Sequence, residues 1–498
     1  MSFLERLDDR LNPIAVKELR QAVRGKFVAV AVILSLFGQL LAVAFLAASS
    51  SFLSPTVDQQ GGGPAAFMAL YGVLFTICIF LIPAYSGFRM AAERSDANID
   101  LLFITTIQPH TIVIGKLISI VAMVVLLFSA SLPFLVFSYV LRGIDLISIL
   151  ILLFVAFATV INHSLLALCV GCLPASKPFK ILLAAAFFLG TFLIFPPVLA
   201  FASQTLRVGI GLFVMTMSGL VTFAVTTVAV QAILLIVTTA MLMPPVANRA
   251  LPIRATLAVM WVLTYAGAAL FRDRSGTNRA LDAWAVGALV VISLVLLSAV
   301  GERESWAPRV ARTIPSHPLR RFLAFVFFSG AGGGVLWCLF FYAATIALYV
   351  LTQTGTSSVR ALADGALCML AYALTAALIR RKWLTRVPPR VTWAIALVLF
   401  LILAIVPALV AFLMDAETTS FSGYVQIATI ANPFPSSMRS AVAKDIRTAT
   451  LAFWCFVELI LAAPWIAQQL GRFRRYQAAA AEGLDWSSPL RLHGARTE

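Results

Sequence analysis

The sequence predicts an all-α, polytopic integral membrane helix bundle of about twelve transmembrane helices, with both termini in the cytoplasm. Of the 498 residues, 61% are hydrophobic and only 12% are charged, whereas a soluble domain carries about 25% charged residues. Long apolar runs recur along the whole chain, each near or above the roughly 20 residues that a helix needs to cross a bilayer. Because these runs are apolar on every side, they favour helices over the alternating strands of a membrane barrel.

The expected spans divide near residue 246 into two halves of six. They are 27–48, 67–88, 117–140, 146–170, 179–202, 209–243, 255–271, 284–300, 322–350, 361–380, 391–413 and 450–470. The first half occupies 27–246, the second occupies 247–471, and a basic tail follows over 472–498. The run 209–243 is too long for one straight span, and one interpretation is that it includes a re-entrant piece.

Lysine and arginine are distributed unequally between the two sides of the membrane. With the N-terminus in the cytoplasm, 28 of the 37 Lys and Arg fall on the cytoplasmic side and 9 on the other. The positive-inside rule predicts this asymmetry; the exception is a trio after the seventh span, Arg272, Arg274 and Arg279. Topology and attraction to acidic lipid headgroups therefore explain the net charge of +16. The charge does not indicate nucleic-acid binding, since the basic residues are scattered over several short loops.

Residues 1–26 precede the first span, and the stretch 12–26 predicts a short amphipathic helix. Asn12 can cap this helix, and Pro13 suits its first position. Such a basic helix beside a span usually lies in the membrane interface, although the same pattern also suits a solvated anchor with no further role. The residues assigned to this interface helix are Asn12, Pro13, Lys17, Glu18, Arg20 and Arg24.

A polar segment over 89–116 separates the second span from the third, and it is one of the few long charged interruptions in the chain. Glu93, Asp96 and Asp100 supply a charged side, while Leu101 and Leu102 belong to an apolar side. A segment held between two spans is too short to fold as a domain. Our hypothesis is that it presents a small helical surface to a partner on the cytoplasmic side; the alternative is an ordinary interfacial loop.

Two ionisable residues lie inside expected spans. Glu458 is near the middle of the last span, where a charge costs roughly 2.5–3.5 kcal/mol, and His163 lies in the fourth span. Intramembrane ionisable groups are functional candidates. A hydrogen bond to a neighbouring helix explains Glu458 equally well and explains His163 better. Two isolated groups do not form a proton relay.

No other motif in the sequence indicates a metal or a cofactor. Cys169 and Cys172 have the spacing of half a zinc site, but no second pair follows, so packing at a helix end is favoured. Gly115 and Lys116 lack the glycine spacing of a phosphate-binding loop, and the glycine-rich run 330–334 lacks a lysine and favours close helix packing. We therefore expect no cofactor, no metal and no catalytic residue.

The two halves carry a thin internal similarity. The loop after the second span of each half opens with Glu-Arg, at 93–94 and at 302–303, and later holds Thr-Ile followed by a histidine. This similarity would suit a parallel repeat about an axis normal to the membrane. The alternative is that the loops resemble each other because both must be short, polar and basic.

The polar segment resembles the stretch after the second span in permeases of ABC exporters of the ABC-2 class. The matching residues are Glu93-Arg94, Asp100-Leu101-Leu102, Thr105, Pro109, Ile112-Val113 and Gly115-Lys116. The leader is similar to the same family's N-terminal interface helix, and Asn432-Pro433-Phe434 is similar to its turn before the final span. Ala97 and Asn98 stand where the family has Gly-Thr.

The resemblance implies a permease subunit without its own ATPase activity, which couples ATP hydrolysis by a separate ABC-type ATPase subunit to substrate export. That subunit would bind the cytoplasmic face and push on residues 93–110. The implied coupling residues are Glu93, Arg94, Asp96, Asp100, Leu101, Leu102, Pro109 and Lys116. The implied partners are this ATPase, membrane lipids and either a second permease or a second copy of the chain, in a bacterial inner membrane.

Two other classes of function stay open. An ion-coupled secondary transporter of a small or lipophilic substrate would depend on Glu458 or His163 and would work without ATP. An intramembrane enzyme would need a polar site at one membrane face, and the sequence indicates none. No residue of a substrate pocket can be picked out, so the sequence does not predict the transported substrate.

Overall fold

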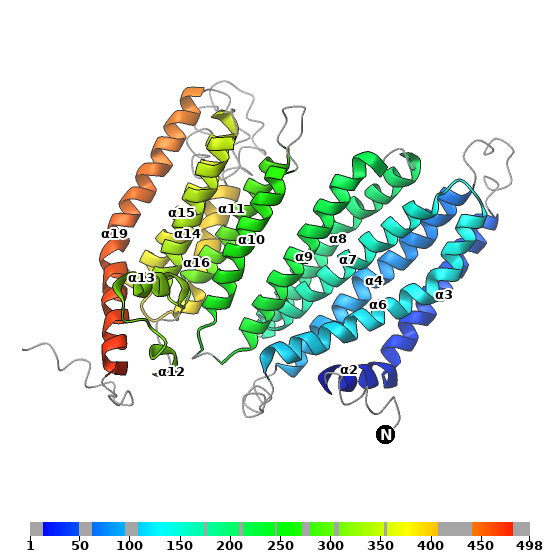
Figure 1. The fold of residues 1–498 in the computed structure, drawn as a ribbon, viewed down its shortest axis with the longest axis horizontal. Helices are drawn as coiled ribbons and strands as arrows, with labels where there is room; N and C mark the ends of the chain where they lie inside the picture. The colour runs from blue at the N-terminus through cyan, green and yellow to red at the C-terminus, as the bar shows by residue number, and fades with distance from the viewer. Residues whose placement is uncertain are drawn as a thin grey trace, which may run out of the picture. The chain divides into compact units, whose positions relative to one another are not determined.

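The computed structural model describes residues 13–48, 62–94, 108–173, 177–208, 213–244, 247–270, 279–302, 308–352, 356–406 and 441–481. Every element in these ranges is helical and none is a strand, which confirms the all-α prediction. The chain forms two compact units, Met1–Pro244 (unit 1) and Pro245–Glu498 (unit 2) (Figure 1).

Eleven helices in the described ranges are long and apolar enough to cross a membrane, so the chain is a multi-pass membrane protein. They overlap eleven of the twelve expected spans. The remaining one, expected at 391–413, begins as α16 (Thr392–Phe400) and continues as a single π-helical turn, η5 (Leu401–Ile405). From residue 407 onward this span lies outside the described residues.

Unit 1 contains one short amphipathic helix and six long apolar helices. In chain order they are α2 (Pro13–Arg24), α3 (Lys26–Ala48), α4 (Gly63–Glu93), α6 (Pro109–Val140), α7 (Leu146–Gly171), α8 (Lys177–Val208) and α9 (Phe213–Leu242). In Figure 1, α2 runs across the lower end of the long helices and meets α3 at Gly25. Asp145 caps α7, because its Oδ2 accepts a hydrogen bond from the Ser148 N–H at 2.8 Å.

Helix α4 is the centre of unit 1, since it packs against α3, α6, α7 and α8. Its aromatic rings stack along one face, Phe67 on Tyr71 and Tyr71 on Phe75, and all three are buried. Small residues let α4 and α7 approach closely: a Cβ added to Gly171 would lie 2.7 Å from the Gly87 carbonyl oxygen. Close contact through small residues is typical of packed membrane helices.

Helix α9 differs from the interpretation of the sequence. It is one continuous helix of 30 residues, so a re-entrant piece within Phe213–Leu242 is ruled out. At 1.5 Å per residue the helix is about 45 Å long, which exceeds the hydrocarbon core of about 30 Å. Tilting, or projection of one end from the bilayer, accommodates the extra length.

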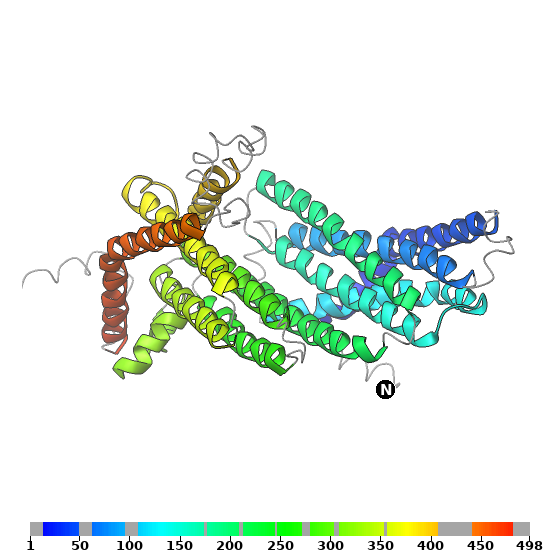
Figure 2. The same cartoon turned by 90° about the horizontal axis from the view of Figure 1, so that it is seen from above.

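Unit 2 contains α10 (Ala250–Leu270), α11 (Arg279–Ala299), α12 (Pro308–Ala311), α13 (Pro318–Phe327), α14 (Ala331–Thr352), α15 (Thr356–Lys382), a 3₁₀ turn η4 (Pro389–Val391), α16, η5 and α19 (Ala441–Ala481). α11 packs against α10, α14 and α15, and α15 packs against α19. Figure 2 shows α19 bent between its orange and red parts. Pro464 lies inside this helix, and an internal proline removes a backbone hydrogen bond and bends the helix.

The single span expected at 322–350 is interrupted, which corrects the prediction. α13 ends at Phe327, α14 begins at Ala331, and the three residues between them are not helical. With 10 residues, α13 is too short to cross a bilayer, and its amphipathic character suits the interface. The interruption frees backbone groups that a continuous helix would bond internally, and side chains from neighbouring helices and from the segments beside them bind these groups.

Candidate functional site

Four charged side chains from three helices meet at the end of unit 1 that the charge distribution predicts to be cytoplasmic. Glu18 comes from α2, Arg89 and Glu93 come from the last turns of α4, and Lys116 comes from α6. Lys116 Nζ lies 2.9 Å from Glu18 Oε1 and 2.6 Å from Glu93 Oε2. Arg89 Nε lies 2.9 Å from Glu18 Oε2 and 3.7 Å from Glu93 Oε1. These four residues are the charged cluster.

The charged cluster is buried on one side and open on the other. The side chains of Lys116 and Glu18 are only 6% and 7% exposed, whereas that of Glu93 is 37% exposed. Two cations face two carboxylates, so the charges within the cluster balance. A buried charge is stable only when it is paired and hydrogen-bonded. Glu18 and Lys116 therefore depend on each other.

Small residues explain why α2 lies against α6. A Cβ added to Gly115 of α6 would lie 2.9 Å from Ile14 Cβ, so a larger residue would push α2 away. Ala15 and Ala22 follow the helical spacing of Glu18 and are buried on the same face. Ser119 Oγ of α6 donates a hydrogen bond to the Ala15 carbonyl oxygen at 3.5 Å. This close approach brings the Glu18 carboxylate within reach of Lys116.

Arg89 is the member of the charged cluster that the sequence analysis missed. Its Nη1 donates to Tyr85 Oη at 2.9 Å, and its Nη2 donates to Gln21 Oε1 on α2. The Tyr85 ring in turn stacks on Phe27, with ring centroids 4.2 Å apart. One signal was available: Arg89 lies four residues before Glu93, the spacing of an ion pair on a helix.

Arg94 connects the same end of α4 to α9. Its Nη2 donates to the Met241 carbonyl oxygen at 3.0 Å. Burial lowers the pKa of the Arg94 guanidinium, because an apolar environment disfavours the charged form. Charged side chains therefore bind the end of α4 to α2, α6 and α9.

The other residues predicted for this site fall into three groups. Pro13 and Pro109 are the first residues of α2 and α6. Three basic residues of α2 are exposed: Lys17, Arg20 and Arg24. Five predicted residues lie outside the described residues: Asn12, Asp96, Asp100, Leu101 and Leu102.

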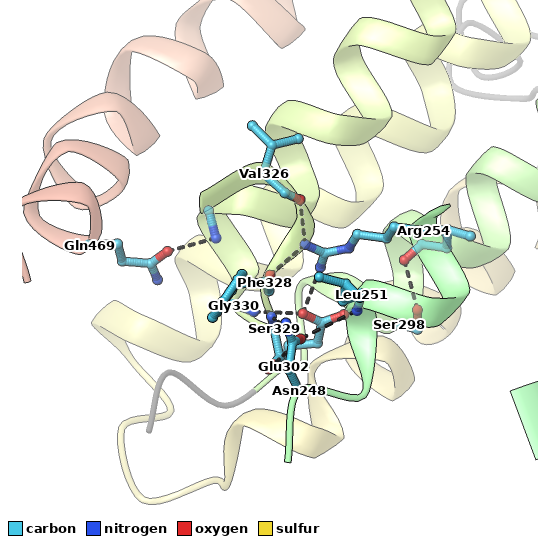
Figure 3. Close-up of polar contacts among 12 residues, drawn as sticks. Asn248, Leu251, Arg254, Ser298, Glu302, Val326, Phe328, Ser329, Gly330 and Gln469 are labelled. Atoms are coloured by element: carbon cyan, nitrogen blue, oxygen red, sulfur yellow. Dashed lines mark hydrogen bonds and ion pairs between the residues drawn. The ribbon is translucent and has the colours of Figure 1, made fainter. Parts of the chain in front are cut away.

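A second buried ion pair lies in unit 2, and the sequence analysis did not identify it (Figure 3). Arg254 of α10 is 1% exposed, and its Nη2 lies 2.6 Å from Glu302 Oε2, just beyond α11. Its Nη1 donates to the carbonyl oxygens of Val326 and Phe328 at 2.8 and 2.7 Å. Burial raises the pKa of Glu302, and Arg254 together with the Gly330 N–H opposes this shift by stabilising the carboxylate.

Side chains around this ion pair explain the interruption between α13 and α14. The carbonyl groups at the end of α13 accept from Arg254, and the N–H groups near the start of α14 donate to three side chains. Glu302 accepts from Gly330 at 2.7 Å, Gln469 from Gly332 at 2.7 Å and Asn248 from Ser329 at 3.1 Å. Each freed backbone group in these contacts has a partner, as buried backbone requires.

Glu93 and Glu302 occupy comparable places, at the ends of α4 and α11, and each pairs with a buried cation. The cations differ in origin. Lys116 belongs to the helix after the polar loop, whereas Arg254 belongs to the helix before α11. The shared carboxylate suits the repeat hypothesis and the different cations do not, so the repeat stays a hypothesis.

Each of the two intramembrane candidates bonds to a neighbouring helix of its own unit. His163 Nε2 lies 2.7 Å from Thr191 Oγ1 of α8. Glu458 Oε1 accepts from Trp454 Nε1 at 2.8 Å and from Thr375 Oγ1 of α15. Glu458 Oε2 is buried and has no hydrogen-bond partner among the described residues. Hydrogen bonds between helices therefore account for His163 fully and for Glu458 in part.

The cysteine pair and the glycine-rich run lie at helix ends and helix contacts. Cys169 and Cys172 carry free thiols at the end of α7, and the described part of the chain holds no group of three or more His, Cys, Asp or Glu placed to bind a metal. Gly334 permits a close helix approach, since a Cβ there would lie 2.6 Å from Arg254 Nη2. Among the sites described, the charged cluster is the one that brings several predicted functional residues together. Its ion pairs link α2, α4 and α6.

Comparisons of the chain with protein-family models, with curated proteins and with solved structures found no match. The function is therefore inferred from the geometry of the charged cluster together with the sequence resemblance.

Proposed function

We propose that the chain is the membrane-spanning permease subunit of an ABC-2-class exporter, driven by a separate ABC-type ATPase subunit. The observation that carries the proposal is that one charged cluster joins α2, α4 and α6 on both sides of the segment 95–107. Glu93 lies two residues before that segment, and Lys116 lies in the second turn of the helix that follows it. Three of the four cluster residues, Glu18, Glu93 and Lys116, belong to the motifs that resemble the family.

A partner that pushes on residues 93–110 would move three helices together. The ion pairs of Glu18 and Glu93 with Lys116 tie α2, the end of α4 and the start of α6 to one another. Since α4 packs against α3, α6, α7 and α8, displacement of its end would reach most of unit 1. Closely packed interiors transmit such strain because they compress little. Rocking of this bundle would move substrate outward.

The division of labour between the subunits gives the first test. The purified chain is expected to hydrolyse no ATP, and the chain purified together with an ABC-type ATPase subunit, sought first among the products of neighbouring genes, is expected to hydrolyse it. The two measurements use the same detergent and the same ATP concentration. Appreciable ATPase activity from the chain alone would contradict the proposal, as would failure of the native chain to capture any ABC-type ATPase subunit from the cells that express it.

Neutralising Glu93 gives the second test, because this carboxylate is the exposed member of the charged cluster. Glu93→Gln is expected to weaken capture of the ATPase about fivefold, the effect of losing roughly 1 kcal/mol from an exposed ion pair. Asp145→Asn is the matched control: it also neutralises one carboxylate of unit 1, but at the start of α7, on the opposite side of the membrane in the predicted topology. Equal capture by the two variants would contradict a contact at Glu93.

Ion-coupled transport is the second candidate, and one observation favours it. Glu458 is buried inside a span, and its Oε2 has no hydrogen-bond partner in the described parts of the chain. Intramembrane carboxylates in transporters often bind the coupling ion. Transport into vesicles under a proton or sodium gradient, without ATP and lost in Glu458→Gln, would favour this candidate over the exporter.

A further inference from the structure

A groove lies between α4, α7 and α8 of unit 1, and none of its lining residues belongs to the charged cluster. Its volume is about 610 Å³, within the roughly 300–1,000 Å³ that is typical of small-molecule sites. The last turns of α4 and α7 and the first turns of α8 line it, so it lies at the predicted cytoplasmic side of the membrane. The lining residues include Pro83, Gly87, Phe88, Lys180, Ala184 and Phe188.

The lining is apolar except for one cation. Alanine, glycine, leucine, isoleucine and phenylalanine dominate it, and Lys180 is its single charged residue. Lys180 makes no ion pair with a described residue, unlike Lys116 in the charged cluster. A lysine near the end of a span places its ammonium at the level of the lipid headgroups. The groove therefore combines an apolar lining with a positive charge at one end.

The dimensions suit an acyl chain. From Lys180 to Phe188, α8 rises about 12 Å at 1.5 Å per residue, close to the roughly 15 Å that one leaflet contributes to the hydrocarbon core. The outer face of α8 is highly exposed, with Leu182, Leu189 and Phe192 each at least 60% accessible. An acyl chain could therefore enter the groove laterally, without crossing the bilayer.

We propose that this groove binds an anionic lipid of the cytoplasmic leaflet, with one acyl chain between α4, α7 and α8 and the acidic headgroup at Lys180. A second copy of the chain suits the groove less well. A two-fold contact across it would bring two Lys180 side chains together, and none of the residues that line the groove is acidic. The proposal does not depend on which energy source drives transport.

The experiment uses the full chain in phosphatidylcholine nanodiscs that contain a trace of phosphatidylglycerol with a photoreactive group on one acyl chain. Irradiation followed by peptide mass spectrometry is expected to place adducts within residues 83–91 and 181–188. Unlabelled phosphatidylglycerol is expected to compete for the site, and phosphatidylcholine is not. Soluble glycerol phosphate tests a free anion in place of a lipid, and it is expected not to compete.

Two variants and one control distinguish the contribution of the Lys180 charge to lipid binding from that of the apolar groove. Lys180→Gln is expected to reduce labelling about fivefold, the usual effect of one basic residue on acidic-lipid binding. Ala184→Trp fills the groove and is expected to abolish labelling. Ala186→Trp places the same side chain at an exposed position of α8 that does not line the groove, and it is expected to label like the native chain.

Three results would overturn the proposal. Equal labelling by a phosphatidylcholine probe would show that headgroup charge is not recognised. Unchanged labelling in Lys180→Gln would show that Lys180 does not bind the headgroup. Dissociation of an oligomer by Ala184→Trp, without lipid adducts in the native chain, would assign the groove to a second copy. If Ala184→Trp does not fold, the Lys180→Gln comparison and the competition experiment still decide.

Discussion

Replacing Glu18 with glutamine tests whether the charged cluster holds α2 on the membrane bundle. The substitution preserves the size of the side chain and removes its charge. Lys116 is then left with Glu93 as its partner, and Arg89 loses its shorter carboxylate contact of 2.9 Å. Glu93→Gln is the matched control, since it removes a carboxylate from the same two cations.

The two substitutions differ in expected cost because the two carboxylates differ in burial. Glu18 is 7% exposed and Glu93 is 37% exposed. Removing one partner of a buried pair costs about 3–5 kcal/mol, whereas an exposed pair contributes about 0–1 kcal/mol. At about 2–4 °C per kcal/mol for a unit of this size, Glu18→Gln should lower the Tm of unit 1 by roughly 6–20 °C. Glu93→Gln should lower it by less than about 4 °C.

The distribution of tryptophan and cysteine allows each unit to be followed separately. All nine tryptophans lie after residue 244, so their fluorescence reports on unit 2. Replacing Cys338, Cys368 and Cys455 with serine leaves three cysteines, all in unit 1, whose reaction with a thiol-sensitive dye reports on unit 1. In this background, Glu18→Gln is expected to advance the thiol transition on heating and to leave the tryptophan transition in place.

Two results would refute this reasoning. Equal shifts of the thiol transition in Glu18→Gln and Glu93→Gln would mean that burial does not decide the cost. A shift below about 2 °C in Glu18→Gln would mean that less than roughly 1 kcal/mol depends on the pair. The double variant Glu18→Gln with Lys116→Met should recover part of the loss, because it removes the buried ammonium that would otherwise keep only the more exposed Glu93 as its partner.

Three further predictions concern single side chains. Arg254→Lys should destabilise unit 2 by about 3 kcal/mol, because lysine lacks the planar fork that binds two carbonyl oxygens and Glu302 together; an unchanged tryptophan transition would contradict this. Gly115→Val should displace α2 at a cost of about 1–3 kcal/mol, seen as faster maleimide labelling of Ala15→Cys, and unchanged labelling would count against the close contact with α6. Glu458→Gln can still accept hydrogen bonds from Trp454 and Thr375, so ATP-driven transport should stay within about twofold. Loss of that transport in a variant that still folds would contradict a purely hydrogen-bonding role for Glu458.

The spans were predictable because hydropathy is a local property that adds along the chain. A run of about 20 apolar residues must leave water whatever its neighbours are. The same reasoning failed at 322–350, where apolar residues continue through the interruption between α13 and α14. Nothing local marks that interruption except glycine, because the groups that stabilise it come from other parts of the chain: Arg254 of α10, Glu302 just beyond α11 and Gln469 of α19.

The candidate site was predictable in its parts and unpredictable in its assembly. Glu18, Glu93 and Lys116 each stood out as charges at the edges of apolar helices, but the sequence assigned Glu18 to an interface helix and the other two to a polar loop. Arg89 opens the predicted polar segment 89–116 but was not assigned to the site, because its carboxylate partner Glu18 lies on another helix, 71 positions away along the chain. Their meeting depends on how α2 crosses α6, which the Gly115 contact permits.

By itself, the sequence determined that this chain is a helical multi-pass membrane protein, and it supplied the charges available at each helix end. Tertiary structure alone decided which of those charges are buried together: Glu18 and Lys116 are 98 positions apart along the chain and 2.9 Å apart in space. The physical reason is that the two effects depend on neighbours at different distances along the chain. Apolar burial is fixed residue by residue, whereas an ion pair forms only where packing brings two distant side chains within a few ångströms and excludes water around them.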